Sequence, residues 1–418
     1  MVQGRAAHEE GLMRESISLE GMHPLFQGGD LFRLTVEADR IAALDIELGT
    51  HYRGIEKLAE TKSWDQLPFL LERICGMCSS SHPAAAVRAM EELSGVPVPE
   101  RAQYIRTLVC ELERIQSHLL WFGTVGNNAG FQSLWMWTWK YRERICKVFE
   151  TVFGNRLIPS VFMVGGVRRD IEEETIPWMQ ESLDRFQPAL DLLEGVLTGD
   201  LIFGIRTKSI GVLSEEGVRK YGMVGPAARA SGVAVDVRKD DPYFAYPWVD
   251  WNLAVRQEGD VHANAEIRLF EMRESLDIVR QCLKQMKSGP VQAAVKSLPG
   301  GMGIGRVEAP RGELFYCLIG DGTHRPIRVQ IRAPSSANLP ALEESAVGAD
   351  LDDAAVIVAA ADPCTGCAER MVVIGRADPF QRILAGVELV RRSHDKTRRL
   401  REKENGTRIG ADSADFRG

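Results

Sequence analysis

Two short cysteine motifs, separated by most of the chain, are the residues best suited to carry chemistry. Cys75 and Cys78 form one C-x-x-C, and Cys364 and Cys367 form the other. This spacing lets two sulfurs from one turn reach the same metal ion, although redox dithiols and half zinc sites share it. A zinc ribbon places its second pair about 15–20 residues after the first. Here nearly the whole protein lies between the pairs, so a shared metal would sit at the centre of the fold.

Four thiolates narrow the choice of metal. Soft sulfur ligands favour zinc, copper(I), nickel and iron–sulfur centres over magnesium or calcium. Structural zinc sites are usually local in sequence, so a redox metal is favoured and zinc stays open. A disulfide scaffold fits less well, because eight cysteines in 418 residues are few for a secreted protein and no signal-peptide pattern is seen. The other four cysteines are expected to be ordinary buried residues: Cys110, Cys146, Cys282 and Cys317.

The residues around the two pairs resemble the large subunit of NiFe hydrogenases. The first pair lies in R-x-C-G-x-C-x-x-x-H, which ends at His82, and the second in D-P-C-x-x-C-x-x-R, which ends at Arg370. Arg370, where many relatives have His, resembles the membrane-associated, energy-converting group related to respiratory complex I. Five further stretches match in the same order: H-Y-R-G-I-E-K at 51–57, E-L-E-R-I-Q-S-H-L-L at 111–120, G-G-V-R-R-D at 165–170, V-G-P-A-A-R-A-S-G at 224–232 and E-A-P-R-G-E at 308–313.

The resemblance implies a nickel ion held by all four cysteines. Cys78 and Cys367 would bridge to an iron that carries CO and CN ligands, while Cys75 and Cys364 would bind nickel alone. The thiolate of Cys75 or Cys364, which would bind nickel alone, is basic enough to accept the proton released when H2 is cleaved heterolytically. No nucleotide cofactor is expected, because the glycine-rich stretch 300–305 lacks the strand-then-helix arrangement of a dinucleotide site.

Three more residues match functional positions of that family. Arg311 corresponds to an arginine that overhangs the metals, where a guanidinium keeps its charge when buried. Asp362 is the matching carboxylate before the second pair. The alternative for both is an ordinary salt bridge or helix cap. His82 is expected to hydrogen-bond a thiolate and not to ligate metal.

Two departures from the family pattern affect the expected chemistry. Glu56 matches a magnesium ligand, but Arg370 stands where the partner histidine would be. Because arginine cannot ligate magnesium, a Glu56–Arg370 pair is favoured over that metal site. Membrane-bound relatives carry a proton-transfer glutamate where this chain has Gln27 or Gly28. Either Glu20 or Asp30 takes over proton transfer, or the exit route differs, or hydrogen turnover is weak.

Composition and charge limit the classes of protein and the cellular locations that fit this chain. Its 44% hydrophobic residues can bury a large core, and its formal charge of −7 shows no block of one sign, so nucleic-acid binding is not indicated. No apolar run approaches the roughly 20 residues needed to cross a bilayer. We therefore expect a cytoplasmic chain, attached peripherally to the membrane through partner subunits. The resemblance implies an iron–sulfur small subunit, membrane-embedded antiporter-like subunits and maturation factors as partners.

Hydrophobic periodicity predicts an α+β fold that is predominantly α. After a loose arm at 1–15, a single domain is expected over 16–375, followed by a basic helical extension and tail at 376–418. Within the domain, 16–62 is an α/β part that includes a hairpin at 31–46, 63–290 is a helical bundle, and 291–375 contains strands before the second pair. The predicted elements are helices at 99–122, 131–153, 173–198, 258–287, 342–352 and 387–404 and strands at 307–318 and 327–331. The tryptophan-rich start of 131–153 is expected to pack against helices or a partner subunit.

The leading function is the catalytic large subunit of an energy-converting NiFe hydrogenase, which interconverts H2 with protons and electrons. The main alternative is a complex I-like subunit that binds quinone or transfers electrons without hydrogen turnover. A non-catalytic scaffold is the third. Many family members are cut after the last motif residue once nickel is inserted, which here predicts cleavage between Arg370 and Met371.

Overall fold

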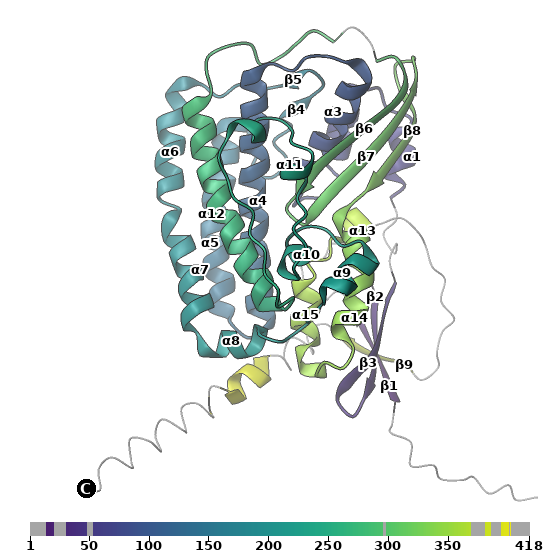
Figure 1. The fold of residues 1–418 in the computed structure, drawn as a ribbon, viewed down its shortest axis with the longest axis vertical. Helices are drawn as coiled ribbons and strands as arrows, with labels where there is room; N and C mark the ends of the chain where they lie inside the picture. The colour runs from purple at the N-terminus through teal and green to yellow at the C-terminus, as the bar shows by residue number, and fades with distance from the viewer. Residues whose placement is uncertain are drawn as a thin grey trace, which may run out of the picture.

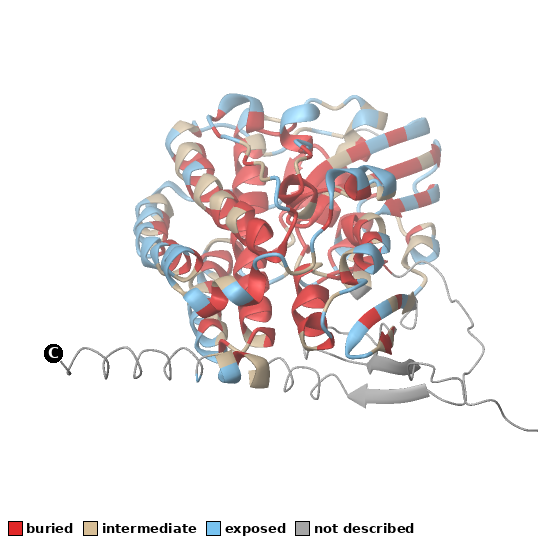
Figure 2. Ribbon diagram, turned by 60° about the horizontal axis from the view of Figure 1, so that its bottom comes forward, coloured by how far each residue is buried: buried red, intermediate tan, exposed pale blue. Residues whose placement is uncertain are grey.

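The computed structural model describes residues 14–20, 31–47, 53–295, 298–368, 381–385, 394–400 and 402. It confirms an α+β fold that is predominantly α (Figure 1). Long helices form a bundle on one side of the molecule, and a three-stranded sheet stands beside them. Shorter helices fill the space between the bundle and a small N-terminal sheet. Buried residues run through both the bundle and the three-stranded sheet (Figure 2).

The bundle is organised around helix α4, Glu100–Asn128. Its expected apolar stripe is present, but its opposite face is buried too, including charged residues such as Arg106, Glu111 and Arg114. A helix buried all round lies inside a fold and not on its surface. Helices α5, Gln132–Phe153, and α12, Val261–Gln285, pack against it along most of their lengths.

The single helix predicted at 173–198 is divided in the structure. A short 3-10 turn at Glu173–Thr175 leads into α6, Ile176–Asp184, and α7 follows at Gln187–Gly199. Proline lies in the first turn of both α6 and α7. Because proline lacks an N–H group and clashes with the preceding turn, it is tolerated where a helix begins and ends a helix elsewhere. Periodicity alone did not resolve this break.

The three-stranded sheet is antiparallel and ordered β6-β7-β8, with bounds Gly300–Ala309, Gly312–Asp321 and Pro326–Arg332. The continuous strand predicted at 307–318 is wrong, because the chain reverses at Pro310–Arg311. The glycine-rich stretch has a packing role: a Cβ at Gly303 or Gly305 would collide with carbonyl oxygens of helix α3, Ser81–Ser94. Helix α3 therefore lies directly on strand β6.

The N-terminal sheet contains the predicted hairpin. Strands β2, Leu31–Glu37, and β3, Arg40–Glu47, pair antiparallel through the turn at Ala38–Asp39. Strand β1, Arg14–Glu20, pairs antiparallel with β2 and parallel with β9, Gln381–Ala385. The sheet order is β3-β2-β1-β9. A segment that follows the second cysteine pair thus closes the sheet made by the start of the chain.

The approach to the second cysteine pair is helical. Helices α13, Pro334–Asn338, α14, Pro340–Ala346, and α15, Ala354–Ala360, lead to α16, Thr365–Ala368. The helix predicted at 342–352 is therefore wrong beyond Ala346. Gly348 has a φ of 82°, a conformation that favours glycine and interrupts a helix. The buried helix α15 leads directly to the second cysteine pair.

Part of the basic C-terminal extension is helical and packed. Residues 394–400 form helix in the described part of the extension. Lys396 Nζ lies 2.7 Å from Asp353 Oδ2, and Arg399 Nη2 lies 3.1 Å from Asp352 Oδ2. Thr397 is buried and donates to the Ala129 carbonyl at the end of α4. Among the described helices, none combines the length and apolar character that a membrane crossing needs.

Candidate metal centre

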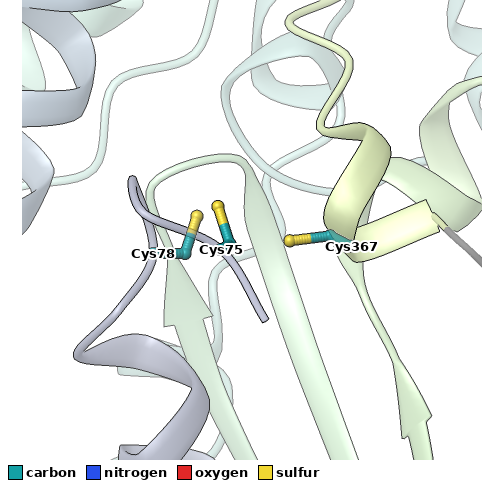
Figure 3. A group of neighbouring side chains, drawn as sticks. All are labelled: Cys75, Cys78 and Cys367. Carbon is teal, nitrogen blue, oxygen red and sulfur yellow. The ribbon is translucent and has the colours of Figure 1, made fainter. Parts of the chain in front are cut away.

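The two cysteine motifs, far apart in the sequence, meet in the folded chain (Figure 3). The sulfurs of Cys75, Cys78 and Cys367 all lie within 4.8 Å of one another. Cys364 Sγ joins them, 3.2 Å from Cys75 Sγ and 3.1 Å from Cys367 Sγ. None of the four is in a disulfide, and three are buried while Cys364 is half-buried. The predicted four-sulfur cluster is thus present at the junction of the bundle, α3 and α16.

Backbone packing brings the motifs this close. A Cβ on Gly366 would lie 2.6 Å from the carbonyl oxygen of Ile74, so only glycine fits between the second pair and the first. Arg53 then links both motifs: its Nη2 donates to the carbonyls of Ile74 at 2.8 Å and Gly366 at 3.2 Å. Its Nη1 donates to the Arg73 carbonyl at 3.1 Å. Sequence reasoning did not assign a role to Arg53.

Contacts among the four thiols shift their pKa values in opposite directions. Hydrogen bonds from Cys364, Cys367 and Cys78 lower the pKa of Cys75 well below its ordinary value, although burial opposes this. Its neighbours keep their protons: hydrogen bonding to Cys364 and Cys75, together with burial, raises the pKa of Cys367 well above the ordinary value. A metal cation would stabilise all four sulfurs as thiolates, because bound thiols lose their protons.

The structure brings Arg311 and Asp362 to the cysteine sulfurs. At the β6–β7 turn, Arg311 Nη1 is 3.4 Å from Cys78 Sγ, and Nη2 is 2.6 Å from Asp362 Oδ1. Burial disfavours the charge, but Asp362 and the cysteine sulfurs raise the pKa of Arg311 well above its ordinary value. Asp362 has a φ of 54°, a strained conformation for a residue other than glycine. Its other oxygen lies 3.0 Å from Nη1 of Arg268, a partner that sequence reasoning missed.

His82 contacts the cluster through hydrogen bonds, as expected. Its Nε2 lies 3.3 Å from Cys367 Sγ, and its Nδ1 lies 2.7 Å from the hydroxyl of Tyr316. The ring is buried at the first turn of α3. With Tyr316 fixing one nitrogen, the other is directed at the sulfur, which is the arrangement that orients and tunes a metal ligand.

A buried carboxylate that sequence reasoning missed fixes the start of α3. Glu113 on α4 accepts hydrogen bonds from the backbone N–H groups of Ser80 at 2.5 Å and Ser81 at 3.0 Å. These groups directly follow Cys78, so Glu113 anchors the first cysteine loop to the bundle. Burial raises the pKa of Glu113 to about 7 despite those hydrogen bonds. The helix that carries the E-L-E-R sequence was expected to be half-exposed. The sequence therefore did not indicate that both of these glutamates are buried.

Of the remaining predicted site residues, Glu56 lies away from the cysteine centre, and the side chains of the others lie outside the described part of the chain. Glu56 lies in α1, Ile55–Ala59, and accepts from the Ile331 backbone N–H at 2.9 Å. It lines a cleft on the outer face of the three-stranded sheet with arginines 306, 328 and 332. Glu20 ends strand β1, where side chains are outside the described part. Asp30 and Arg370, and with them the proton-carrier and Glu56–Arg370 predictions, lie outside the described residues.

A second buried polar region adjoins the cysteines, and we call it the arginine–carboxylate cluster. It consists of Glu111, Arg114, Arg229, Asp236, Arg238, Glu271 and Glu308, all buried. Arg229 lies 2.6 Å from Glu271 and 2.9 Å from Glu308. His118 connects it to the site, since it lies 2.9 Å from Glu271 and 3.2 Å from Arg268. Burial lowers the pKa of His118 to about 4, so the ring is neutral there.

The site's donor set fits a soft metal ion. Four convergent sulfurs, each from one end of a C-x-x-C, match thiolate-ligated nickel, zinc or iron. The buried guanidinium beside Cys78 provides a positive group close to the sulfurs without competing for them. This arrangement is that of a protein class whose two cysteine pairs, one near each end of the chain, could hold one metal ion.

Comparisons with known proteins agree with this class. Residues 128–300 and 294–370 match the family described as respiratory-chain NADH dehydrogenase, 49 Kd subunit, and residues 53–125 match nickel-dependent hydrogenase. The carbon monoxide-induced hydrogenase of Rhodospirillum rubrum is 37% identical over 85% of this chain and 99% of that protein. The membrane-bound hydrogenase subunit alpha of Pyrococcus furiosus is 34% identical over 92% of this chain and 94% of that protein.

Relatives with other names are nearly as similar. A subunit of the F(420)H(2) dehydrogenase of Methanosarcina mazei is 35% identical over 85% of this chain and 97% of that protein. A chain in the solved structure of the membrane-bound sulfane sulfur reductase, an archaeal respiratory membrane complex, has a TM-score of 0.81 and 32% identity. That match covers 87% of this chain and all of the other. The chain belongs to the family that unites NiFe-hydrogenase large subunits with the 49 kDa subunits of respiratory complex I.

Proposed function

We propose that this chain is the catalytic large subunit of an energy-converting NiFe hydrogenase. The observation that carries the proposal is the convergence of all four cysteine sulfurs beneath Arg311. The full-length similarity to two hydrogenase subunits supports it. Cys75, Cys78, Cys364 and Cys367 would hold nickel, with Cys78 and Cys367 shared with an iron that carries CO and CN. Bound there, the metals would supply an open coordination position at which H2 is split or formed.

The chain's own residues perform the remaining tasks in this proposal. Arg311 places a permanent positive charge 3.4 Å from Cys78 Sγ, and Asp362 holds that guanidinium in place. Cys364, the half-buried sulfur, holds the proton that leaves H2. His82 keeps Cys367 oriented through its bond at 3.3 Å. Three of the four cysteines are buried, so the charged groups beside them act in a low dielectric.

The setting of the proposed enzyme follows its relatives. We propose a cytoplasmic subunit, peripheral on the membrane, that passes electrons to a separate iron–sulfur small subunit and associates with membrane-embedded antiporter-like subunits. Maturation factors would insert the metals. Glu20 and Asp30 stay the predicted proton carriers, magnesium at Glu56 and cleavage after Arg370 stay predictions, and no nucleotide or nucleic acid is expected.

A complex I-like role without hydrogen turnover is the second candidate. The match to the 49 Kd subunit family spans a longer part of the chain than the match to nickel-dependent hydrogenase. The relative from Methanosarcina mazei is likewise named as part of a dehydrogenase and not of a hydrogenase. The four cysteines distinguish the two candidate functions. A complex I-like subunit without hydrogen turnover needs no metal of its own.

Activity measurements on the native complex test the proposal. We expect H2-dependent reduction of a viologen dye by the complex purified from its own host. Cys367→Ser should abolish it, while Cys317→Ser, at a buried thiol in β7 outside the cluster, should retain it. Equal dye reduction by the Cys367→Ser complex, or none by the wild type after full maturation, would favour the second candidate.

A further inference from the structure

The arginine–carboxylate cluster contains more carboxylates than guanidiniums. Its four carboxylates and three guanidiniums are all buried: Glu111, Asp236, Glu271, Glu308, Arg114, Arg229 and Arg238. Arginine stays charged in proteins, so four ionised carboxylates would leave one uncompensated negative charge in the interior. An isolated carboxylate that is removed from water takes up a proton instead of staying ionised, because the charged form is so costly there. The charge count therefore predicts one protonated carboxyl in this cluster.

The uncharged polar neighbours of the cluster do not change this count. Burial lowers the pKa of His118 to about 4, so its ring is neutral although it lies 2.9 Å from Glu271. Three more titratable neighbours are neutral because burial raises their pKa values well above the ordinary ones: Cys110, Tyr243 and Tyr246. No compensating positive charge comes from these groups.

The described charged neighbours outside the cluster have partners of their own or face solvent. Arg88 on α3 lies 3.6 Å from Asp241, and Arg268 on α12 lies 3.0 Å from Asp362. The short helix α11, Val237–Asp240, adds two exposed residues of opposite charge: Lys239 and Asp240. The cluster therefore has to balance its charge by itself.

Glu308 is the carboxylate of the cluster with the fewest charged partners. Its Oε1 lies 2.9 Å from Arg229 Nη1, and its Oε2 accepts a hydrogen bond from the backbone N–H of Val237 at 3.2 Å. Arg229 is itself shared, because it also lies 2.6 Å from Glu271. Burial and the nearby carboxylate of Asp236 raise the pKa of Glu308 to about 7.

The other three carboxylates each contact two guanidiniums. Glu111 lies 3.1 Å from Arg114 and 3.2 Å from Arg238. Asp236 lies 2.7 Å from Arg238 and 3.3 Å from Arg229. Burial disfavours their charge, but the guanidiniums lower the pKa values of all three carboxylates. The charge count and the contacts thus agree on which carboxyl keeps a proton.

A chain of polar contacts connects the cluster to the cysteine centre. Arg268 Nη1 lies 3.2 Å from His118 Nδ1 and 3.0 Å from Asp362 Oδ2. Asp362 in turn holds Arg311, whose Nη1 is 3.4 Å from Cys78 Sγ. Charges in such a buried setting interact more strongly than charges in water. Added negative charge at the sulfurs therefore favours the protonated form of a carboxyl in the cluster.

We propose that Glu308 is a proton store for chemistry at the cysteine centre. Its carboxylate takes up one proton from solvent when the centre gains one of the electrons of H2, and the carboxyl returns that proton to solvent when the electron leaves. The net charge of the buried region then stays constant. This rests on the proposed function for the source of the electron. The store gives the chain an ionisable carboxyl near the centre, although Gln27 or Gly28 stands where membrane-bound relatives carry a proton-transfer glutamate.

Infrared difference spectroscopy of the native complex tests the store at the C=O stretching band of a protonated carboxyl. Subtraction of the Glu308→Gln spectrum from the wild-type spectrum isolates the band of Glu308. Glu72 and Glu113, whose pKa values burial also raises to about 7, remain in both samples and cancel. We expect the band to be about tenfold weaker at pH 8 than at pH 6. At pH 7 it should grow roughly 1.5-fold when dithionite reduces the complex.

Three variants separate the store from a structural role. Glu308→Gln resembles the protonated carboxyl, so the large subunit should fold and keep wild-type nickel content. Glu271→Gln removes an ionised carboxylate that two guanidiniums share, so recovery of folded large subunit should fall at least tenfold. Cys367→Ser should keep the Glu308 band at pH 6 and lose its growth on reduction, because the centre no longer accepts the electron.

Two results would overturn the inference. One is identical carboxyl bands in the wild type and Glu308→Gln at pH 6, and the other is a wild-type band that stays unchanged on reduction. Nickel content of the wild type is read separately. A nickel-free wild type whose Glu308 band still grows on reduction supports the proton store and contradicts the proposed function.

Discussion

The two buried polar regions of this protein are built on opposite principles. In the arginine–carboxylate cluster, the chain supplies both signs of charge, and Arg238, for example, lies 2.7 Å from Asp236 and 3.2 Å from Glu111. In the cysteine centre, four potential anions converge, and Arg311, the nearest cation, is already paired with Asp362. In the first region each arginine is paired with carboxylates of this chain, whereas the second region gathers four sulfurs that a bound cation could share. The chain thus places a core of paired charges beside a group of four cysteines that could hold a metal ion.

The largest expected effect comes from separating the two cysteine motifs. Gly366→Ala would place a Cβ 2.6 Å from the Ile74 carbonyl and 3.0 Å from Arg53 Nη2, so the second pair must move away from the first. We expect loss of nearly all bound nickel, measured by elemental analysis of the purified complex. Gly76→Ala is the matched change in the first pair, where no atom lies within 4 Å of the added Cβ. Equal nickel in both variants would show that the motifs need not meet.

The second effect concerns the region that needs no metal. Arg229→Met leaves Glu271 and Glu308 buried without their shared counter-charge, and breaking such a pair costs about 3–5 kcal/mol of unfolding free energy. Urea unfolding of the complex's large subunit measures this loss. Arg219→Met breaks an exposed pair with Glu215 on helix α9, Glu215–Tyr221, and such pairs contribute about 0–1 kcal/mol. A similar small loss for Arg229→Met would contradict a core stabilised by its paired charges.

The third effect falls on the metal site's own cation. Arg311→Lys keeps a positive charge but loses the fork that reaches Cys78, Ser117 and Asp362 together. We expect nickel content to stay at the wild-type level while H2 turnover falls at least tenfold. Arg328→Lys, on the outer face of β8, provides the control and should retain full turnover. Loss of nickel with Arg311→Lys would assign Arg311 to holding the site and not to its chemistry.

The last effect is a pH dependence of stability at the anchor of the first loop. Burial raises the pKa of Glu113 from 4.5 to about 7, so the folded state binds its proton more tightly than the unfolded state between these values. Stability from this group is therefore lost as pH rises from about 4.5 to 7, at up to about 1.4 kcal/mol per pH unit. Glu113→Gln should flatten the pH profile of unfolding free energy by that amount over this window. An unchanged slope would mean that Glu113 is ionised throughout.

The sequence predicted the centre of this protein better than its connections. The four cysteines could be assigned to one site from their two motifs, and Arg311, Asp362 and His82 could be added because their surroundings resemble those of NiFe-hydrogenase large subunits. Arg53, Glu113 and Arg268 could not, since each acts through backbone carbonyls, N–H groups or a single carboxylate that only the folded chain brings near. Their residue types are common on surfaces, and no spacing rule marks a buried glutamate on a helix.

Local periodicity also failed where packing or turn chemistry decides. The stretch expected to be one strand, 307–318, contains the turn that carries Arg311. Apolar residues on both sides of that turn concealed the chain reversal at Pro310. The helix expected at 173–198 ends where Pro188 starts another. The glycine-rich stretch at 300–305 has few of the side chains that indicate a strand. Its glycines instead allow helix α3 to pack closely against it. In each case the missing information was a contact distant in sequence.

Nickel analysis combined with infrared spectroscopy of the native complex tests the central claim most directly. The account predicts about one nickel per chain, as four thiolates of one site bind one such ion, together with bands from iron-bound CO and CN. The Cys367→Ser complex should lack both signals. Fully matured wild-type complex with no nickel and no such bands would contradict the account, and the complex I-like function would then replace it.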